Sequence, residues 1–281
     1  TRSAAATISS FVNLFFGAIA RTPSLETYHL IYCSIYIDHY NAGNRTRQQS
    51  KALELLKCTK NMGIVVSHSR KRALLLPAFN TTNLEMTYAI AKGLNKAGLP
   101  GFIQISSNNL RLSNPATIAA ITADALKDSD VPIALHLDHG RSYEDVKACL
   151  NAGFTSVMID ASHLDFDENI ALVRKTADYC HFYGVPVEAE LGALAGKEDE
   201  DVSEADCKTD PALVEEFVIR SGCDTLAVSI GNVHGLDAVP KIDLPLLEQI
   251  GKVSPVPLVM HGGSGIDMNI IRRLKDYGMI K

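Results

Sequence analysis

The chain has 281 residues, of which 46% are hydrophobic and 21% are charged, and its formal net charge is −5 at pH 7. This composition is ordinary for a globular protein with one large core, and the acidic balance argues against a general nucleic-acid-binding protein. No apolar run reaches the ~18 residues of a membrane-spanning helix, so we expect no membrane partner.

The first 72 residues differ from the rest in charge. They contain ten Lys and Arg and three Asp and Glu, whereas residues 73–281 contain 17 and 29. Residues 1–25 include two arginines and no acidic residue, so organellar targeting and a disordered or foreign extension both remain open. We therefore separate an atypical basic N-terminal extension, residues 1–72, from a body, residues 73–281. The six cysteines form no CxxC pair, which favours reduced thiols and a cytoplasmic location.

From residue 74 onward, short apolar segments rich in β-branched residues alternate with amphipathic segments of helical periodicity. The apolar segments predict strands at residues 74–79, 101–105, 131–137, 156–159, 185–190, 225–230 and 257–261. The amphipathic segments predict helices at residues 84–97, 115–126, 143–152, 167–183, 211–221, 244–253 and 268–277. Seven successive βα units predict an α/β protein with a (β/α)8 TIM barrel, and an open doubly wound sheet is the alternative.

The predicted barrel is incomplete. An eighth strand would begin at Ile280 and Lys281, where the sequence ends. An opened barrel leaves unpaired strand edges, so we consider the strand-like residues 30–37 as a substitute for the eighth strand. The alternative is that the extension packs poorly and the barrel stays open.

Three of the predicted strands lead to a histidine that is followed by a glycine, namely His139, His234 and His261. The C-terminal ends of the strands are where parallel barrels build their active sites. Three converging imidazoles without a cysteine partner suit a catalytic Zn²⁺ that keeps an open coordination position. The alternative is that each histidine is hydrogen-bonded locally at its strand end.

Several carboxylates accompany these histidines. Asp138 directly precedes His139, and it could transfer protons to a metal-bound substrate or orient a histidine from behind. Glu188 and Glu190 share one face of the fifth predicted strand, and Glu190, at the tip, is the better candidate for the site. The long acidic loop of residues 193–208 is most simply a solvated loop, although an acid on such a lid could act as a base.

The segment Gly262-Gly263-Ser264-Gly265 follows the last predicted strand and leads into a helix. Glycines leave backbone N–H groups free to face an anion, and barrels often bind phosphate in this loop. The segment therefore predicts a phosphate site, with a simple glycine-rich loop as the alternative.

In their order along the chain, six motifs resemble the class II, metal-dependent fructose-bisphosphate aldolase family, which includes tagatose-bisphosphate aldolases. They are PAFN at 77–80, HLDHG at 136–140, SVMIDAS at 156–162, VEAELG at 187–192, GNVHG at 231–235 and HGGSG at 261–265. The resemblance implies a TIM barrel in a homodimer or homotetramer. It also implies a phosphorylated sugar substrate, fructose 1,6-bisphosphate, which is cleaved to dihydroxyacetone phosphate and glyceraldehyde 3-phosphate.

The resemblance implies a role for each matching residue. His139, His234 and His261 would bind a catalytic Zn²⁺, and Asp138 would transfer the proton of the C4 hydroxyl. The other matches are Glu198, for proton transfer at the dihydroxyacetone phosphate carbon; Asp160 and Glu190, for a displaced or second metal ion; Asn80 and Ser106, around the substrate; and Gly235, Gly262, Gly263 and Ser264, for phosphate and a monovalent cation, Na⁺ or K⁺.

The chain departs from the family in the eighth strand, whose phosphate-binding motif would follow Lys281. Three alternatives therefore stay open beside a fructose-bisphosphate aldolase. The first is a tagatose-bisphosphate or related ketose-phosphate aldolase, the second is a non-catalytic remnant of the family, and the third is a metal-dependent hydrolase barrel. The third is disfavoured by the predicted phosphate site.

Overall fold

The computed structural model describes residues 74–192, 196–198, 201–203, 208–235 and 239–281. The predictions made for residues 1–72, including a strand at 30–37, lie outside the described residues. Within the described part, no helix has the length and apolar character needed to cross a membrane.

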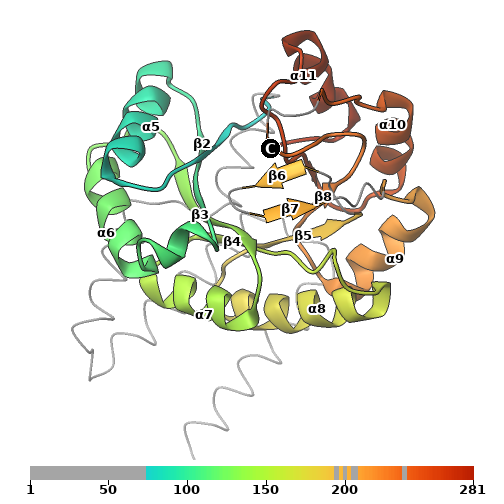
Figure 1. Cartoon of the computed structure of the whole chain (residues 1–281), viewed down its shortest axis with the longest axis horizontal. Coiled ribbons are helices and arrows are strands. Elements are labelled where there is room, and N and C mark those ends of the chain that lie inside the picture. Colours follow the sequence, from blue (N-terminus) through green and yellow to red (C-terminus); the bar gives the residue numbers. More distant parts are fainter. Residues whose placement is uncertain (1–73, 193–195, 199–200, 204–207, 236–238) are drawn as a thin grey trace, which may run out of the picture. The chain divides into compact units, whose positions relative to one another are not determined.

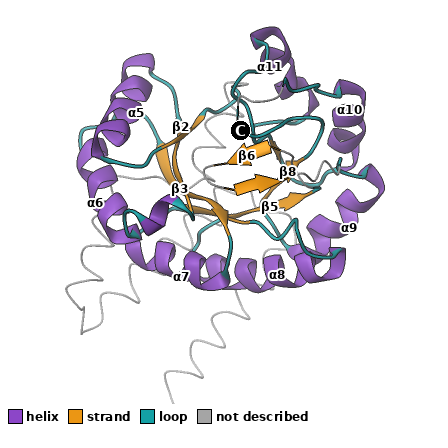
Figure 2. Ribbon diagram, in the orientation of Figure 1, coloured by secondary structure: helices purple, strands orange, loops and turns teal. Residues whose placement is uncertain are grey.

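The body is built on a seven-stranded parallel sheet in the order β1-β2-β3-β4-β5-β8-β9, which confirms the predicted succession of βα units. The sheet curls, and helices follow one another around its outside (Figures 1 and 2). The strands are β1 (Ala78–Asn80), β2 (Gly101–Ser106), β3 (Ile133–Gly140), β4 (Ser156–Ile159), β5 (Val187–Leu191), β8 (Thr225–Val228) and β9 (Leu258–Val259).

The helices of the outer layer are α5 (Leu84–Ala97), α6 (Pro115–Leu126), α7 (Tyr143–Ala152), α8 (Phe166–Phe182), α9 (Pro211–Ser221), α10 (Leu244–Val253) and α11 (Met268–Leu274). Two short 3₁₀ helices cover Asn109–Arg111 and Lys275–Tyr277. After β5, the backbones of β6 (Gly196–Glu198) and β7 (Asp201–Ser203) pair as an antiparallel hairpin.

The helix bounds follow from local capping signals. α5 begins after Asn83, whose side chain accepts a hydrogen bond from the Met86 N–H, and ends at Gly98, which has a left-handed φ of 64°. α6 begins after Asn114, with Pro115 in its first turn. The predicted bounds of α5, α6, α7, α9 and α10 are confirmed to the residue.

The two faces of the buried strands differ in chemistry. Ile103, Leu135 and Val157 pack in the main apolar core with helix residues such as Ile118. Their strand neighbours point to the other face, because side chains alternate along a strand. That face carries two small apolar clusters, which include Phe102 and Met158, together with polar side chains such as Asp138, which is fully buried. The interior of the curl therefore holds a set of buried polar groups that need partners.

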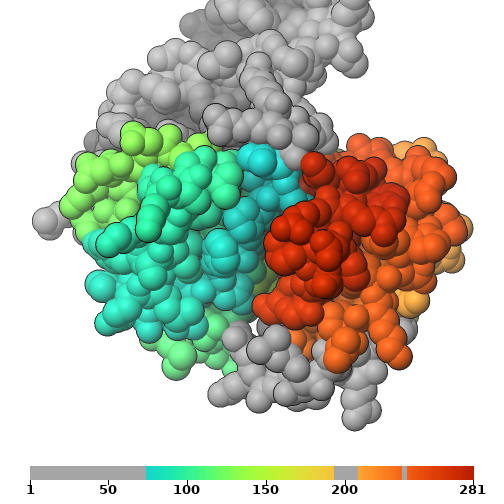
Figure 3. All heavy atoms as spheres, turned by 90° about the horizontal axis from the view of Figure 1, so that it is seen from above, coloured from blue at the N-terminus to red at the C-terminus, as the bar shows by residue number. Residues whose placement is uncertain are grey.

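The expectation of an incomplete barrel is confirmed, because the described parallel sheet has seven strands, but residues 278–281 lie beside β9 and pair with it locally. The Gly278 carbonyl accepts from the Leu258 N–H at 3.0 Å, and the Ile280 N–H donates to the Leu258 carbonyl at 2.9 Å. On the other side, the Leu76 N–H donates to the Ile280 carbonyl at 2.7 Å. In Figure 3 the red surface of the last residues lies against the cyan surface of the first described ones. Residues 278–281 thus link the two ends of the curled sheet through backbone hydrogen bonds.

An ion pair connects α8 to the starts of β5 and β8. The His181 Nε2 lies 2.8 Å from the Asp224 carboxylate, which also accepts from the Val187 N–H at 2.7 Å. The hydrogen bond to Asp224 raises the pKa of His181 above its ordinary value, and this effect outweighs the opposing effect of burial.

We predict that this pair makes the free energy of unfolding depend on pH. Because the pKa of His181 is raised in the folded state, its stabilising contribution is complete below about pH 6.5, the ordinary value. The contribution is lost as the pH rises through the folded-state pKa. The stability difference between wild type and His181→Gln, measured by urea unfolding, should therefore shrink from pH 6 to pH 8. The exposed His163→Gln serves as the control, and a His181 effect independent of pH would contradict the prediction.

Candidate metal centre

An irregularity at the end of β3 determines where Asp138 and His139 point. Leu137 pairs with Val157 and Gly140 pairs with Ile159, so β3 advances three residues while β4 advances two. His139 has a φ of 43°, and within the described chain it is the only non-glycine residue with a positive φ. Such a bulge lets consecutive side chains face the same side of a sheet, at a cost in backbone strain.

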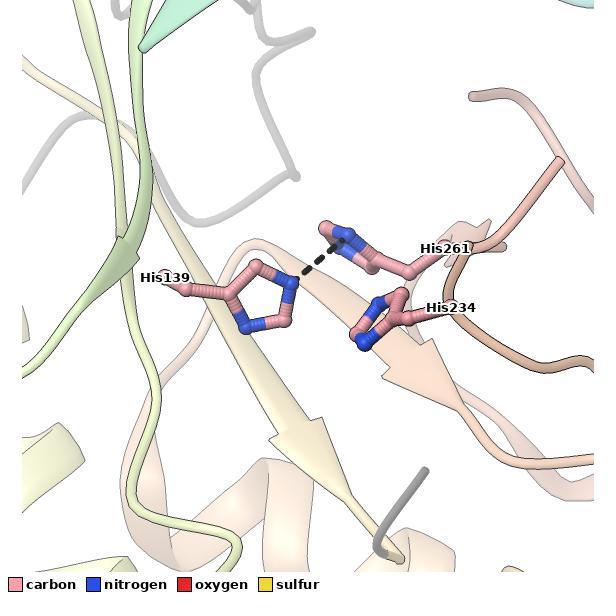
Figure 4. A group of neighbouring side chains, drawn as sticks. All are labelled: His139, His234 and His261. Atoms are coloured by element: carbon pink, nitrogen blue, oxygen red, sulfur yellow. Dashed lines mark hydrogen bonds between the residues drawn. The ribbon is translucent and has the colours of Figure 1, made fainter. Parts of the chain in front are cut away.

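The bulge brings His139 to the two other predicted histidines. The His139 Nε2 lies 3.0 Å from the His261 Nδ1, and the rings of His139 and His234 lie 5.1 Å apart between centroids (Figure 4). One ligand nitrogen from each of the three rings falls within 4.8 Å of the others. The three histidines come from β3 and from the loops that follow β8 and β9. Their spacing allows one metal ion to reach all three.

Carboxylates contact the ring nitrogens that face away from this cluster. The Asp160 Oδ2 lies 2.7 Å from the His139 Nδ1, and the Glu190 Oε2 lies 3.7 Å from the same atom. The Glu188 Oε1 lies 2.8 Å from the His261 Nε2. A carboxylate behind a ligand histidine fixes the orientation and tautomer of its ring, which is common at metal sites.

The electrostatics of the cluster favour neutral rings at His234 and His261. Burial, together with the nearby His139 and His261, lowers the pKa of His234 to about 3. Burial and His139 likewise lower the pKa of His261. The neutral ring is the form that binds a metal ion, so His234 and His261 are in the metal-binding form at neutral pH.

Asp138 is held next to the histidine cluster by an amide. The Gln104 Nε2 donates to the Asp138 Oδ2 at 2.8 Å and to the Asn80 Oδ1 at 2.6 Å. The Asp138 Oδ1 is buried without a hydrogen-bond partner and lies 3.7 Å from the His261 Nδ1. Burial raises the pKa of Asp138, but His139 and His261 outweigh burial and lower it below the ordinary value. Asp138 is therefore an ionised carboxylate with one oxygen free to accept a proton.

Comparison with known proteins agrees with this arrangement. The family model for class-II fructose-bisphosphate aldolase matches residues 60–281. The chain belongs to the class-II fructose-bisphosphate aldolase family. Membership supports aldol cleavage of a ketose bisphosphate as its reaction.

Individual relatives cover most of the chain. A fructose-bisphosphate aldolase of Staphylococcus epidermidis is 40% identical over 207 residues, 72% of each protein. A probable fructose-bisphosphate aldolase of Bacillus subtilis is 37% identical over 225 residues, 79% of each protein.

Solved structures give the same result. The YdjI aldolase from Escherichia coli K12 aligns with a TM-score of 0.70 and 30% identity, over 79% of this chain and 80% of that one. A putative fructose-1,6-bisphosphate aldolase from Coccidioides immitis aligns with a TM-score of 0.71 and 31% identity, over 79% of each chain. The curled parallel sheet is thus an incomplete TIM barrel of the class-II aldolase type.

The other residues predicted for this class-II aldolase lie around the cluster to different extents. His139, Asp160 and Glu190 form a second group whose ligand atoms lie within 4.8 Å of one another. Ser106 is buried at the end of β2, where its Oγ accepts from the Asn109 side chain at 3.2 Å. Gly235, Gly262, Gly263 and Ser264 lie in the loops after His234 and His261, whereas the side chain of Glu198 lies outside the described residues.

The sequence analysis missed two residues of the site, Gln104 and Lys281, and ranked a third, Glu188, behind Glu190. Gln104 and Glu188 each stand two positions before a predicted site residue, Ser106 and Glu190, on the same strand. That spacing places each on the same face as the predicted residue, so it could have identified Gln104, as it placed Glu188 beside Glu190. Lys281 is buried and contacts Glu188, and no local pattern indicates it.

The two histidine-bearing loops touch at a glycine. Gly262 has a φ of 68°, and a Cβ at this position would lie 2.1 Å from the Val233 carbonyl oxygen. A Cβ on the adjacent Gly263 would meet no atom within 4 Å. Gly262 therefore allows the backbone next to His261 to approach the backbone next to His234.

We predict that Gly262→Ala lowers the free energy of unfolding by about 1–3 kcal/mol, through backbone strain and the clash with Val233. Urea unfolding of the metal-free chain measures this change. Gly263→Ala is the matched control and should stay within about 0.5 kcal/mol of wild type. Equal effects of the two substitutions would show that the loop contact is unimportant.

Proposed function

We propose that the chain is a zinc-dependent aldolase that cleaves fructose 1,6-bisphosphate to dihydroxyacetone phosphate and glyceraldehyde 3-phosphate. The observation that carries the proposal is the convergence of His139, His234 and His261 beside the buried, ionised Asp138. Three imidazoles with one open coordination position are a ligand set of a catalytic zinc.

The residues present fit a zinc ion. Two of the three rings have a carboxylate on the far nitrogen, and the ligand set contains no thiolate. His139, His234 and His261 would hold the ion, and a bound Zn²⁺ would supply Lewis-acid stabilisation of the negative charge that develops on the C2 oxygen when the C3–C4 electron pair passes to the C2 carbonyl. No lysine adduct with the carbonyl is then required.

Asp138 is the proposed acid and base at the C4 hydroxyl. In the cleavage direction it takes the hydroxyl proton as the C4 oxygen becomes the aldehyde carbonyl. Its Oδ1 has no hydrogen-bond partner, so this oxygen can accept the proton, while the Gln104 Nε2 holds the other oxygen at 2.8 Å. Gln104 thus keeps the carboxylate in one orientation beside His261.

The same proposal assigns roles to the other predicted site residues. Asn80 and Ser106 contact substrate, and Glu198 transfers the proton at the dihydroxyacetone phosphate carbon. Asp160 and Glu190 provide a second position for the metal ion, next to His139. Gly235, Gly262, Gly263 and Ser264 bind phosphate and a monovalent cation, Na⁺ or K⁺.

Tagatose 1,6-bisphosphate is the second candidate substrate, because the two ketoses differ only in the configuration of one hydroxyl group. We also propose a homodimer or homotetramer and a cytoplasmic location, in keeping with the family's small phosphorylated substrates. Activity assays on both sugars, each with and without a chelator, distinguish the two substrates and test the metal requirement.

We predict that His261→Ala abolishes stoichiometric zinc binding and aldol cleavage, because the imidazole in the loop after β9 completes the ligand set. Metal analysis after dialysis measures the zinc, and a coupled assay with fructose 1,6-bisphosphate measures cleavage. The exposed His163→Ala should keep both properties. Undiminished zinc in His261→Ala would refute the ligand assignment.

We predict that Asp138→Asn keeps zinc but lowers kcat by ~10²–10⁴-fold, the usual loss when a proton-transfer group is removed. Steady-state kinetics with zinc-loaded protein measure the change, and the exposed Asp128→Asn is the control. Near-normal turnover in Asp138→Asn would show that this carboxylate only supports His261.

A further inference from the structure

A buried lysine stands behind one of the metal ligands. Lys281 is 7% exposed, and within the described residues no other Lys or Arg is buried. Its Nζ lies 2.8 and 3.1 Å from the two Glu188 oxygens and 3.1 Å from the His136 Nε2. The ammonium group also lies 5.4 Å from the centre of the Phe102 ring.

The donors and acceptors of this network have one consistent arrangement. An ammonium has three N–H donors and no acceptor, so Lys281 donates to both Glu188 oxygens and to the His136 Nε2. The His136 Nε2 is then an acceptor, and its Nδ1 donates to the Ser156 Oγ at 2.6 Å. All three ammonium donors are satisfied, as a buried cation requires.

The arrangement extends to the metal ligand. The ionised Glu188 can only accept, so the His261 Nε2 donates to its Oε1 at 2.8 Å. The neutral His261 ring has one proton, and that proton is on Nε2. The lone pair is therefore on Nδ1, which lies 3.0 Å from the His139 Nε2 inside the metal cluster.

We propose that Lys281 is a positioning residue for the metal site. It clamps both oxygens of Glu188, and Glu188 fixes the tautomer and rotation of His261 so that its Nδ1 faces the metal. The inference rests on the proposed zinc function and extends it to the eighth strand position, since Lys281 belongs to the segment that pairs with β9.

A purely structural role for Lys281 makes a different prediction. A lysine that only neutralised the buried Glu188 would stabilise the fold, and its removal would lower stability without a selective effect on the metal. A positioning role requires that zinc affinity and the tautomer of His261 change as well. Both quantities are measurable without the catalytic reaction.

The first experiment is the zinc dissociation constant of the full chain, measured by competition with a chelator. Lys281→Met should weaken zinc binding by ~10–100-fold, the usual loss when a group that orients a metal ligand is removed. Lys252→Met, at an exposed ion pair with Glu248 on α10, is the matched control and should leave the constant unchanged. Wild-type zinc affinity in a folded Lys281→Met chain would overturn the proposal.

A second variant tests whether Lys281 acts on His261 through Glu188. Glu188→Gln keeps the shape of the side chain but removes its charge, and it should weaken zinc binding to a similar extent. Because both residues act through His261, the double variant should lose little more than either single variant. Additive losses would show that Lys281 acts independently of Glu188 and would overturn the proposal.

A measurement on the metal-free wild-type chain keeps the proposal testable if the variants do not fold. Imidazole ¹⁵N NMR should show His261 with its proton on Nε2 and His136 with its proton on Nδ1. The opposite tautomer at His261 would overturn the proposal. Different results would refute the two hypotheses. Wild-type protein that binds no zinc would contradict the proposed function. Unchanged zinc affinity in Lys281→Met would contradict only the positioning role.

Discussion

The structure depends on how buried charge is paired inside the curled sheet. Asp138, Glu188 and Glu190 have almost no exposure to solvent, and an unpaired carboxylate in such a place would cost several kcal/mol. Glu188 pairs with Lys281, Asp138 accepts a hydrogen bond from Gln104, and Glu190 lies 3.7 Å from the His139 Nδ1, all from elements distant in the sequence. Apolar packing between the helices and the outward strand faces therefore stabilises the fold. The polar side chains of the inward faces are stable only when the strands pair in the register that brings these side chains to their partners. This requirement makes the functional centre and the interior of the barrel the same set of contacts.

A backbone distortion in β3 is needed, in addition to the register, to bring Asp138 and His139 to the same side of the sheet. In a regular strand Asp138 and His139 would point to opposite faces, and one of them would enter the helix layer. The extra residue in β3 between Leu137 and Gly140, with the positive φ of His139, turns both toward the cluster. Strain of this kind persists where surrounding contacts compensate for it. Here the contacts are the hydrogen bond of His139 to Asp160 on one ring nitrogen and the 3.0 Å approach of the other ring nitrogen to the His261 Nδ1.

The sequence predicted the features that depend on neighbouring residues. Helix bounds came from caps such as Asn114 followed by a proline, and the histidine cluster came from a His-Gly pair repeated after three strands. The predicted C-terminal end of the strand at residues 131–137 was wrong. The pairing of β3 continues past the bulge to Gly140, and no local pattern indicates this. Gln104 and Lys281 were missed because their partners depend on register. Gln104 meets Asp138 across 34 residues of sequence, and Lys281 meets His136 across 145.

The long sequence separation within the lysine network has a consequence for folding. Closing a loop between residues 136 and 281 is entropically costly, and contacts of high sequence separation form late in folding. The alternating βα units have local contacts and can assemble earlier, with the inward carboxylates still hydrated. We therefore expect docking of residues 278–281 to be the step that removes water from Glu188 and orders the His261 ring. In that order of events, the metal-binding geometry appears only after the two ends of the sheet have met, so metal affinity would report that the barrel has closed.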